Sequence, residues 1–457
     1  MLVVYGWLIG PLLAGYLLFD KAFAYLHIPG TPLYIGEVVL GIGVLAVLCA
    51  TGYLRIPVRD EPILALLAVF LLWGLVRAVP GVFEYGLDAV RDSALWYYGM
   101  FALLAVAALA RRPGLRDRLV AGLARLTPWL LLWLPVGMLL IPLEGDAPVL
   151  IVPDSTISVL EHKPEDAAIA ALVAIGCLWL LPAGRSVKAR VAWALLAFLV
   201  LALAATQNRG GLLGVVAGMA VGLVFCRNRV RLSAKALAAI TVVLTLAALL
   251  PLDVPYAGTR GRAFSVDQLG ANVMSLGGED TTGHRDATAE DRKVLWTRIL
   301  QKQETDGLLL VGSGFGPNLA SQVNEYDAPG EFKVRSPHNS HLDVLARMGV
   351  VGLCLWIALW LAWYRRLVVG CRRLEGQGHH LRRRVTVLCL MVATAILVST
   401  FFDPQLEGAQ MAALLWTVFG VGVAVTSVRD WSGNAAARPA ALGSPSRTPP
   451  PPHAGNP

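Results

Sequence analysis

Residues 61–79 read EPILALLAVFLLWGLVRAV, and stretches of this kind decide the fold of the chain. The apolar run is long enough to cross a hydrocarbon core of roughly 30 Å. Since a backbone inside a bilayer must satisfy its hydrogen bonds internally, the run predicts a transmembrane helix. Similar runs occur near residues 2–19, 33–53, 95–110, 121–141, 167–182, 189–206, 210–226, 234–251, 341–364, 385–402 and 409–428. We therefore predict an all-α membrane protein with about twelve transmembrane helices.

The composition of the 457 residues agrees with this prediction. Hydrophobic residues make up 56% and charged residues 15%, and the mean hydropathy is +0.61, so the chain lacks the charged surface of a soluble domain of its size. The net charge of +8 lies mainly in loops between predicted spans, which argues against a nucleic-acid partner. The six cysteines lie within or at the ends of predicted spans without C-x-x-C spacing, which indicates neither a disulfide framework nor a zinc site.

The basic residues orient the predicted helices. Twenty lysines and arginines lie in or beside the loops of one side, seven of them in the loop at 365–384. The short loops of the other side hold four, Lys21, Arg91, Lys163 and Arg209. The positive-inside rule therefore predicts a multi-pass protein of the inner (cytoplasmic) membrane with both termini cytoplasmic. The predicted parts are helices one to nine at 1–251, a large extracytoplasmic loop at 252–340, helices ten to twelve at 341–430, and a disordered cytoplasmic tail at 431–457.

Arg209 is the first candidate site residue, in the turn TQNRGG that begins at Thr206 between two predicted spans. An arginine at such a turn often only anchors the end of a helix. An ionisable residue close to the hydrocarbon that faces a helix bundle is, however, a functional candidate. Gly210 and Gly211 also leave the backbone open to close approach. We therefore favour a role for Arg209 in substrate binding.

The segment RSPHNSHLDVL, which begins at residue 335, is the second candidate. Ser336 is a good N-cap and Pro337 suits the first helical position, so we expect His338 in the first turn of a helix with His341 on the same face. The free N–H groups of that helix end would attract an anion such as pyrophosphate. A neutral His338 would accept a proton from a sugar hydroxyl.

Two other interpretations of this segment stay open. In the first interpretation, both histidines are cap residues at the membrane interface, a role that suits His341 better than His338. In the second, they bind a metal together with Asp343, although the three do not share one helical face. The motif GSGFG at 312–316 resembles a phosphate loop but lacks the Lys-Ser/Thr ending and a βαβ context, so it predicts a turn.

Two further arginines are candidates. Arg292 and Trp296 are spaced i, i+4, which puts an arginine and an aromatic on one face of a predicted helix, either for packing or for ligand binding. Arg91, at the outer end of the fourth predicted span, either pairs with Asp88 or Asp92 or faces the substrate.

Taken together, these motifs resemble the O-antigen ligase and polymerase superfamily of polytopic membrane glycosyltransferases. In order along the chain, the resemblance rests on NRGGLLG at 208–214, DRKVLWTRIL at 291–300, GSGFG at 312–316 and PHNSHLDVLARMGVVGL at 337–353. It implies transfer of a glycan from undecaprenyl pyrophosphate to a glycan or lipid acceptor at the outer face of the inner membrane, without a metal or other cofactor. It further implies that Arg209 and Arg292 hold the pyrophosphate and that His338 activates the acceptor hydroxyl. Arg91 and His341 are additional candidates for substrate binding.

The chemistry of such a transfer agrees with these residue types. Pyrophosphate is a good leaving group, so the main task is to stabilise its growing charge with pre-placed arginines. Alignment of the acceptor hydroxyl by a base supplies the rest. A transporter of a lipid-linked sugar or anion is the rival class, and it predicts charged or Gly/Pro-broken positions in the middle of spans. The third interpretation, a non-catalytic component of polysaccharide assembly, predicts that Arg209 and His338 are dispensable. In each case membrane lipids are partners.

Overall fold

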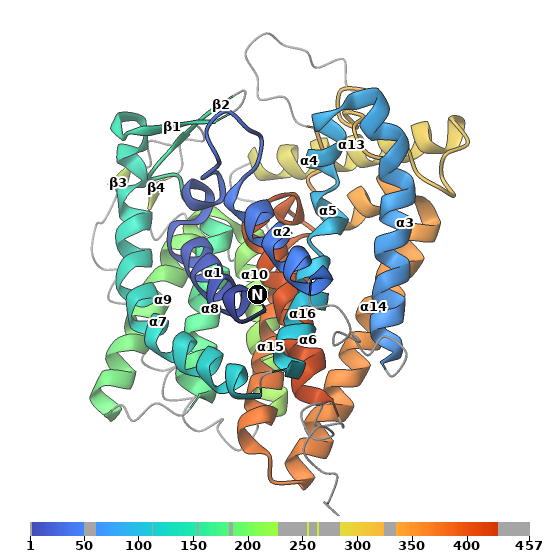
Figure 1. The fold of residues 1–457 in the computed structure, drawn as a ribbon. Coiled ribbons are helices and arrows are strands. Elements are labelled where there is room, and N and C mark those ends of the chain that lie inside the picture. Colours follow the sequence, from blue (N-terminus) through green and yellow to red (C-terminus); the bar gives the residue numbers. More distant parts are fainter. Residues whose placement is uncertain are drawn as a thin grey trace, which may run out of the picture.

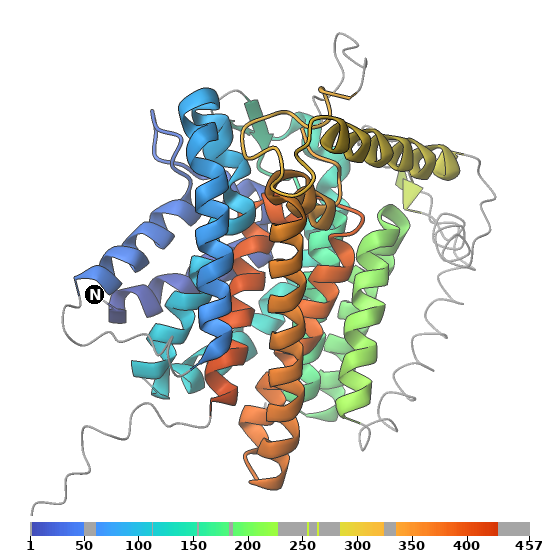
Figure 2. The same ribbon diagram turned by 90° about the vertical axis from the view of Figure 1, so that its right-hand side faces the viewer.

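The computed structural model of the protein describes residues 2–49, 61–111, 113–152, 155–181, 186–226, 254–255, 263–264, 284–323 and 335–427. Most of this part is helical, and the long helices run side by side as a bundle (Figure 1). Helix α13 lies across one end of the bundle (Figure 2), which we call the α13 end. The helices are α1 (Leu2–Ala24), α2 (Ile35–Leu48), α3 (Pro62–Tyr85), α4 (Leu87–Asp92), α5 (Ala94–Tyr97), α6 (Met100–Arg111), α7 (Pro113–Leu140), α8 (Pro164–Leu180), α9 (Val187–Gln207), α10 (Arg209–Phe225), α13 (His284–Thr305), α14 (Ser340–Gly376), α15 (His380–Ser399) and α16 (Ala409–Thr426).

The other regular elements are short. The 3-10 helices η1 and η3 cover Ile141–Asp146 and Gln405–Glu407. Strands β1 (Val149–Val152) and β2 (Ser155–Ser158) form an antiparallel hairpin in which Val149 lies opposite Ser158. Strands β3 (Val254–Pro255) and β4 (Ala263–Phe264) form a second antiparallel pair.

Helices occupy eleven of the twelve predicted span positions, and the twelfth, 234–251, lies outside the described residues. By length and apolar composition, five of the described helices can cross a membrane, namely α1 over Tyr5–Ala24, α3, α7 over Gly114–Leu140, α14 and α16. The pair Leu87–Tyr97 and Met100–Ala110, bent by 46°, adds a sixth if it forms one broken span. The apolar helical segments Ile35–Leu48 of α2, Val191–Gln207 of α9 and Gly210–Phe225 of α10 are shorter. The chain is thus a multi-pass helical membrane protein, and the total of twelve spans stays a prediction.

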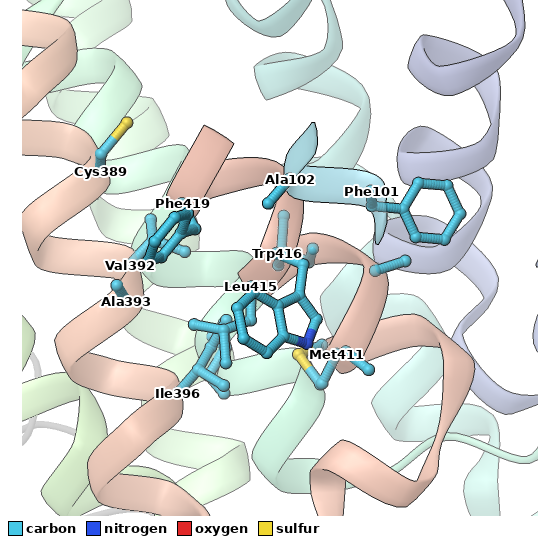
Figure 3. Packing of buried hydrophobic residues seen from close by; sticks show 14 of the residues in the cluster. Phe101, Ala102, Cys389, Val392, Ala393, Ile396, Met411, Leu415, Trp416 and Phe419 are labelled. Carbon is cyan, nitrogen blue, oxygen red and sulfur yellow. The ribbon is translucent and has the colours of Figure 1, made fainter. Parts of the chain in front are cut away.

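The centre of the bundle is formed by α6, α15 and α16 (Figure 3). Trp416 and Phe419 of α16 are fully buried there, as is Ile396 of α15. A Cβ atom at Gly420 would lie 2.4 Å from the carbonyl oxygen of Ala102, so α16 and α6 approach more closely than a larger residue would permit. Small residues at helix contacts are typical of packing inside membranes.

Helix α10 is held against α15 in the same manner. It carries a glycine at every fourth position, at Gly210, Gly214, Gly218 and Gly222. A Cβ atom at Gly214 would lie 2.5 Å from the carbonyl oxygen of Ala395, and one at Gly218 would lie 2.7 Å from that of Met391. This close packing fixes the start of α10, where Arg209 lies, relative to the end of α15.

The α14–α15 hairpin corrects one prediction. The expected loop at 365–384 is helical except for a short turn, because α14 continues to Gly376 and α15 begins at His380. Its arginines donate to the backbone at the ends of other helices, Arg382 to the Val425 carbonyl (2.9 Å) and Arg383 to the Phe225 carbonyl (2.6 Å). Carbonyl groups at helix C-termini have no partner within their own helix, so these bonds stabilise both the hairpin and its neighbours.

The motif GSGFG forms a turn, as predicted, and it packs into a break in α14. The break is at Gly349, which has a φ of +69°. Backbone N–H groups of the turn donate hydrogen bonds to carbonyl groups near the break, that of Ser313 to Ala346 (2.8 Å) and that of Gly314 to Arg347 (3.0 Å). Conversely, the N–H of Val350, just after the break, bonds to a carbonyl that precedes the motif (3.0 Å). The turn and the break therefore satisfy each other's backbone groups.

Candidate active site

Three parts of the chain that are distant in sequence contact the connection between α15 and α16, at the α13 end of the bundle. The backbone N–H of Ser340, at the start of α14, donates to the carbonyl of Thr400 (2.9 Å). Arg292 of α13 donates through Nη1 to the carbonyl of Phe402 (2.9 Å). At the start of α10, a Cβ atom on Gly210 would lie only 2.7 Å from the Cβ of Phe402. The connection thus brings the arginine turn, α13 and the histidine segment together.

His338 lies in the segment just before α14 and has an unusual backbone conformation. Its φ is +53°, in the left-handed region that few non-glycine residues adopt. The preceding carbonyl, that of Pro337, accepts a hydrogen bond from the indole N–H of Trp296 on α13 (2.7 Å). The two residues before His338 and the two residues after it are buried, whereas His338 itself is half-buried. A side chain that is partly open within a tightly held segment is suited to meet a substrate.

The start of α14 differs from the prediction. Neither Ser336 nor Pro337 begins the helix, because the N-cap is Asn339 and the first helical residue is Ser340. His338 therefore precedes the helix instead of lying in its first turn, and the expected shared helical face with His341 is wrong. The physical reason is the asparagine side chain, whose amide oxygen reaches two N–H groups of the first turn at once.

The N–H groups that were expected to attract an anion at this helix end are not free. The Oδ1 of Asn339 accepts hydrogen bonds from the N–H groups of His341 (3.0 Å) and Leu342 (3.1 Å). Since the N–H of Ser340 donates to the α15–α16 connection, the first three N–H groups of α14 are already bonded within the protein. A pyrophosphate at this position would have to displace these bonds, so the cationic side chains are the better donors to a phosphate.

His341 is bonded through both of its ring nitrogens. Its Nε2 lies 2.9 Å from the carbonyl oxygen of Leu397 and 3.1 Å from the hydroxyl of Thr400. The indole N–H of Trp356 donates to its Nδ1 (3.1 Å), and its ring lies 4.1 Å from that of Phe401. Because Nδ1 accepts a hydrogen bond, it carries no proton, so the proton of the neutral ring is on Nε2. These contacts fit a structural role for His341.

Arg209 is the first residue of α10, and its side chain lies outside the part of the chain that the structure describes. Its neighbour Asn208 caps the helix by accepting a bond from the N–H of Gly211 (3.1 Å). The same side chain donates to the carboxylate of Glu165 at the start of α8 (2.9 Å). The backbone of the arginine turn is therefore fixed between α8 and the α15–α16 connection.

On α13, the predicted shared face of Arg292 and Trp296 is confirmed. Both side chains point to the bundle, Arg292 to the carbonyl of Phe402 and Trp296 to that of Pro337. Arg292 is half-buried, so its guanidinium group lies where the end of the bundle meets the exterior.

Asp403 adds a charged group that the sequence analysis did not identify. It lies in the α15–α16 connection, where its carboxyl group is close to that of Glu165. Burial opposes the charged form of Lys163, but the carboxylates of Asp403 and Asp166 outweigh it, so the pKa of Lys163 lies above its ordinary value. We call the group formed by Arg292, His338, Phe402 and Asp403 the junction.

A second set of charges lies beside the junction, and we call it the arginine network. Arg347 of α14 binds Asp343 through Nε (2.9 Å) and Asp92 of α4 through Nη1 (3.0 Å). Asp92 also binds Arg335 (3.3 Å). Side-chain exposure is only 1% for Arg347 and Asp343. Burial, helped by the negative charge of Asp343, raises the pKa of the nearby Glu407 to about 8, although Arg347 opposes the shift.

Arg91, the remaining candidate, is exposed on α4. The aspartates proposed as its partners are used elsewhere, because Asp88 (3.1 Å) and Asp92 bind Arg335. A contact of Arg91 with substrate stays a prediction.

Lys163, Asp403 and Arg347 were not among the predicted site residues, and Asp343 and Asp92 were considered only as a metal ligand and as a partner of Arg91. A usable signal existed in two places, KPED at 163–166 and FDP at 402–404, where acidic residues directly border long apolar runs. Charged groups at such borders tend to be paired and functional. Among the described residues, no three histidine, cysteine, aspartate or glutamate side chains come together as metal ligands.

Comparison with known proteins agrees with the resemblance seen in the sequence. The family model described as O-antigen ligase matches residues 194–357, which contain the arginine turn, α13 and the histidine segment. A search of curated proteins found no match. The matched region ends within α14, so α4, Asp403 and Glu407 lie outside it. Residues 194–357 of this membrane protein therefore match an O-antigen ligase domain, in agreement with the resemblance to the O-antigen ligase and polymerase superfamily.

Proposed function

We propose that the protein transfers a glycan from undecaprenyl pyrophosphate to an acceptor hydroxyl at the outer face of the inner membrane. The observation that carries this proposal is the convergence of α13, the start of α10 and the histidine segment on one connection. It puts a guanidinium group, the backbone of the Arg209 turn and a half-buried imidazole at the same end of the bundle. The family match supports a ligase or polymerase of glycans in general terms.

In the proposed reaction, His338 takes the proton of the acceptor hydroxyl while the acceptor oxygen attacks the anomeric carbon of the donor sugar. The bond between that carbon and the pyrophosphate oxygen breaks, and the lipid pyrophosphate leaves with the electron pair. Arg292 and Arg209 stabilise its growing negative charge, because guanidinium groups present paired N–H donors to phosphate. The proton on His338 then returns to solvent or to the leaving group.

Deletion of the gene is the test of the reaction class. Lipid-linked and surface glycans of the deletion strain would be separated on a gel beside those of the complemented strain. Accumulated carrier-linked polymer indicates a ligase, and accumulated single carrier-linked repeats indicate a polymerase. Unchanged glycans would contradict both a ligase and a polymerase.

The arginines are tested with purified protein and a synthetic lipid-pyrophosphate donor. We expect Arg209→Ala and Arg292→Ala each to abolish most transfer and to weaken donor binding, while Arg209→Lys and Arg292→Lys recover only part, since lysine lacks the paired donors. Arg298 is the matched control, because it is an exposed arginine on the same helix as Arg292. Arg298→Ala should behave like the wild type. Full activity of Arg209→Ala and Arg292→Ala would return both residues to structural roles.

A further inference from the structure

A large cavity lies among α1, α7, α8, α15 and α16, away from the junction. Its volume is about 1350 Å³, which exceeds the roughly 300–1,000 Å³ of pockets that hold drug-sized ligands. Leu13 and Leu17 of α1, Leu388 and Val392 of α15 and Leu126 of α7 are among its lining residues. Apart from three arginines and Thr417, the lining side chains among the described residues are apolar, or the residue is glycine. Such a cavity is suited to hydrocarbon chains.

The three arginines that line this cavity lie on α7, in the half of the helix that begins at Pro113. Arg118 and Arg125 are spaced i, i+7 and therefore lie on one face of the helix, and both are exposed. Arg116 is half-buried and bonds only to the adjacent Asp117 (3.1 Å) among the described residues. The guanidinium group of Arg118 lies over the ring of Trp7, 5.8 Å from its centre. The first turns of α7 lie at the end of the bundle opposite α13 (Figure 1).

Exposed aromatic side chains mark the same region. Trp7 is 63% exposed and Trp129 is 67% exposed, and both line the cavity. Tryptophan is enriched where a membrane meets water, because its ring is apolar and its N–H is polar. Arg118, beside the exposed Trp7 at the edge of an apolar cavity, thus presents a positive charge to which an anionic headgroup can bind.

We propose that this cavity binds one anionic phospholipid, with its acyl chains among α1, α7 and α15 and its phosphate at the arginines of α7. The charge of the site selects the headgroup, since each arginine near a membrane surface favours an anionic lipid by about fivefold. The apolar lining selects the chains. This site is separate from the junction, and it does not depend on the glycan transfer proposed above.

Two glycines allow the cavity to be filled without disturbing the backbone. A Cβ atom added at Gly10 of α1 or Gly122 of α7 would meet no atom within 4 Å, and both residues line the cavity. Leucine is also a better helix former than glycine, so Gly10→Leu and Gly122→Leu should not destabilise their helices. Gly41 of α2 is the matched control, because it has the same open space around its Cβ position and does not line the cavity.

The experiment measures lipid retention by native mass spectrometry. Purified full-length protein is stripped of lipid, then exposed to phosphatidylglycerol or phosphatidylcholine with identical acyl chains. We expect the wild type and Gly41→Leu to retain phosphatidylglycerol at least tenfold better than phosphatidylcholine. The combined variant Gly10→Leu with Gly122→Leu should lose both lipids, and the combined variant Arg116→Gln, Arg118→Gln and Arg125→Gln should lose the preference while still binding.

Thermal unfolding of each variant without lipid is the control for folding. Equal retention of phosphatidylglycerol by the filled variant and the wild type would overturn the site. Retention of a polyprenyl phosphate in place of phosphatidylglycerol, measured in competition, would overturn the choice of ligand. Because retention is measured without glycan substrates, loss of transfer activity in the junction variants leaves this test unaffected.

Discussion

The junction and the arginine network lie next to each other at the α13 end but use their charges in opposite ways. In the network, Arg347 and Asp343 are almost fully buried, and their bonds join α4, α14 and the GSGFG turn. In the junction, Arg292 and His338 are half-buried and lie at the surface of the bundle. Buried charges that bond to each other hold a structure in place, whereas partly open ones can meet a ligand. We therefore expect changes in the junction to cost rate and changes in the network to cost stability.

The largest expected effect is that of His338→Ala on turnover. Loss of a positioned base typically lowers the rate by about 10²–10⁴-fold, and donor affinity, carried by the arginines, should change little. The measurement uses purified protein with a synthetic lipid-pyrophosphate donor and determines turnover and donor affinity separately. His341→Ala is the matched control, since His341 bonds within the protein and its loss should mainly lower the midpoint of thermal unfolding.

If His341→Ala rather than His338→Ala lost turnover, the comparison between the junction and the arginine network would fail. If His341→Ala abolishes turnover with its fold intact, or if EDTA stops the reaction, His338 is not a metal-free base. The comparison is sharpened if the rate of His338→Ala no longer varies with pH in the range where the wild type shows the titration of an imidazole.

Next in size is Arg347→Met, which tests the network. Removing one partner of a buried ion pair costs about 3–5 kcal/mol, because Asp343 would keep a buried charge without its cation. We expect a lower midpoint of thermal unfolding and a lower yield of folded protein. Arg347→Met combined with Asp343→Leu should recover part of this loss, as no carboxylate at 343 then remains unpaired. A stable Arg347→Met protein that lacks transfer activity would assign the network a direct part in the reaction.

The sequence predicted the helices and the turn at 312–316 but not the start of α14. Apolar runs are long and repeat the same signal, so helices are found at eleven of the expected positions. The boundary was wrong because Ser336 and Asn339 are both good caps, and the helix begins after Asn339, whose side chain accepts from two N–H groups, with Ser340 bonded to Thr400. Asp403 was missed for a related reason, since its partner Lys163 lies 240 residues earlier in the chain.

The remaining expected effect is that of pH on stability through Glu407. Its pKa in the folded protein is about 8, above its ordinary 4.5, so the folded state holds a proton that the unfolded state releases. The free energy of unfolding therefore falls as the pH rises from about 4.5 to about 8. Glu407→Gln cannot ionise, so we expect it to match the wild type near pH 4.5 and to unfold a few degrees higher above pH 8. Parallel unfolding curves of the two proteins across this range would contradict the shift.

The length of helix α14 also influences where the junction lies relative to the membrane. After the break at Gly349, its residues 350–376 extend over about 40 Å at 1.5 Å per residue, which is longer than the roughly 30 Å of a hydrocarbon core. One end is tied to the arginine network and the other to carbonyls of α16, so this helix cannot slide along its axis without breaking bonds at both ends. A change in bilayer thickness must then be absorbed by tilt or by the shorter helices α2 and α10. The distance of the junction from the opposite membrane surface is thereby set by α14, independently of the lipids around it.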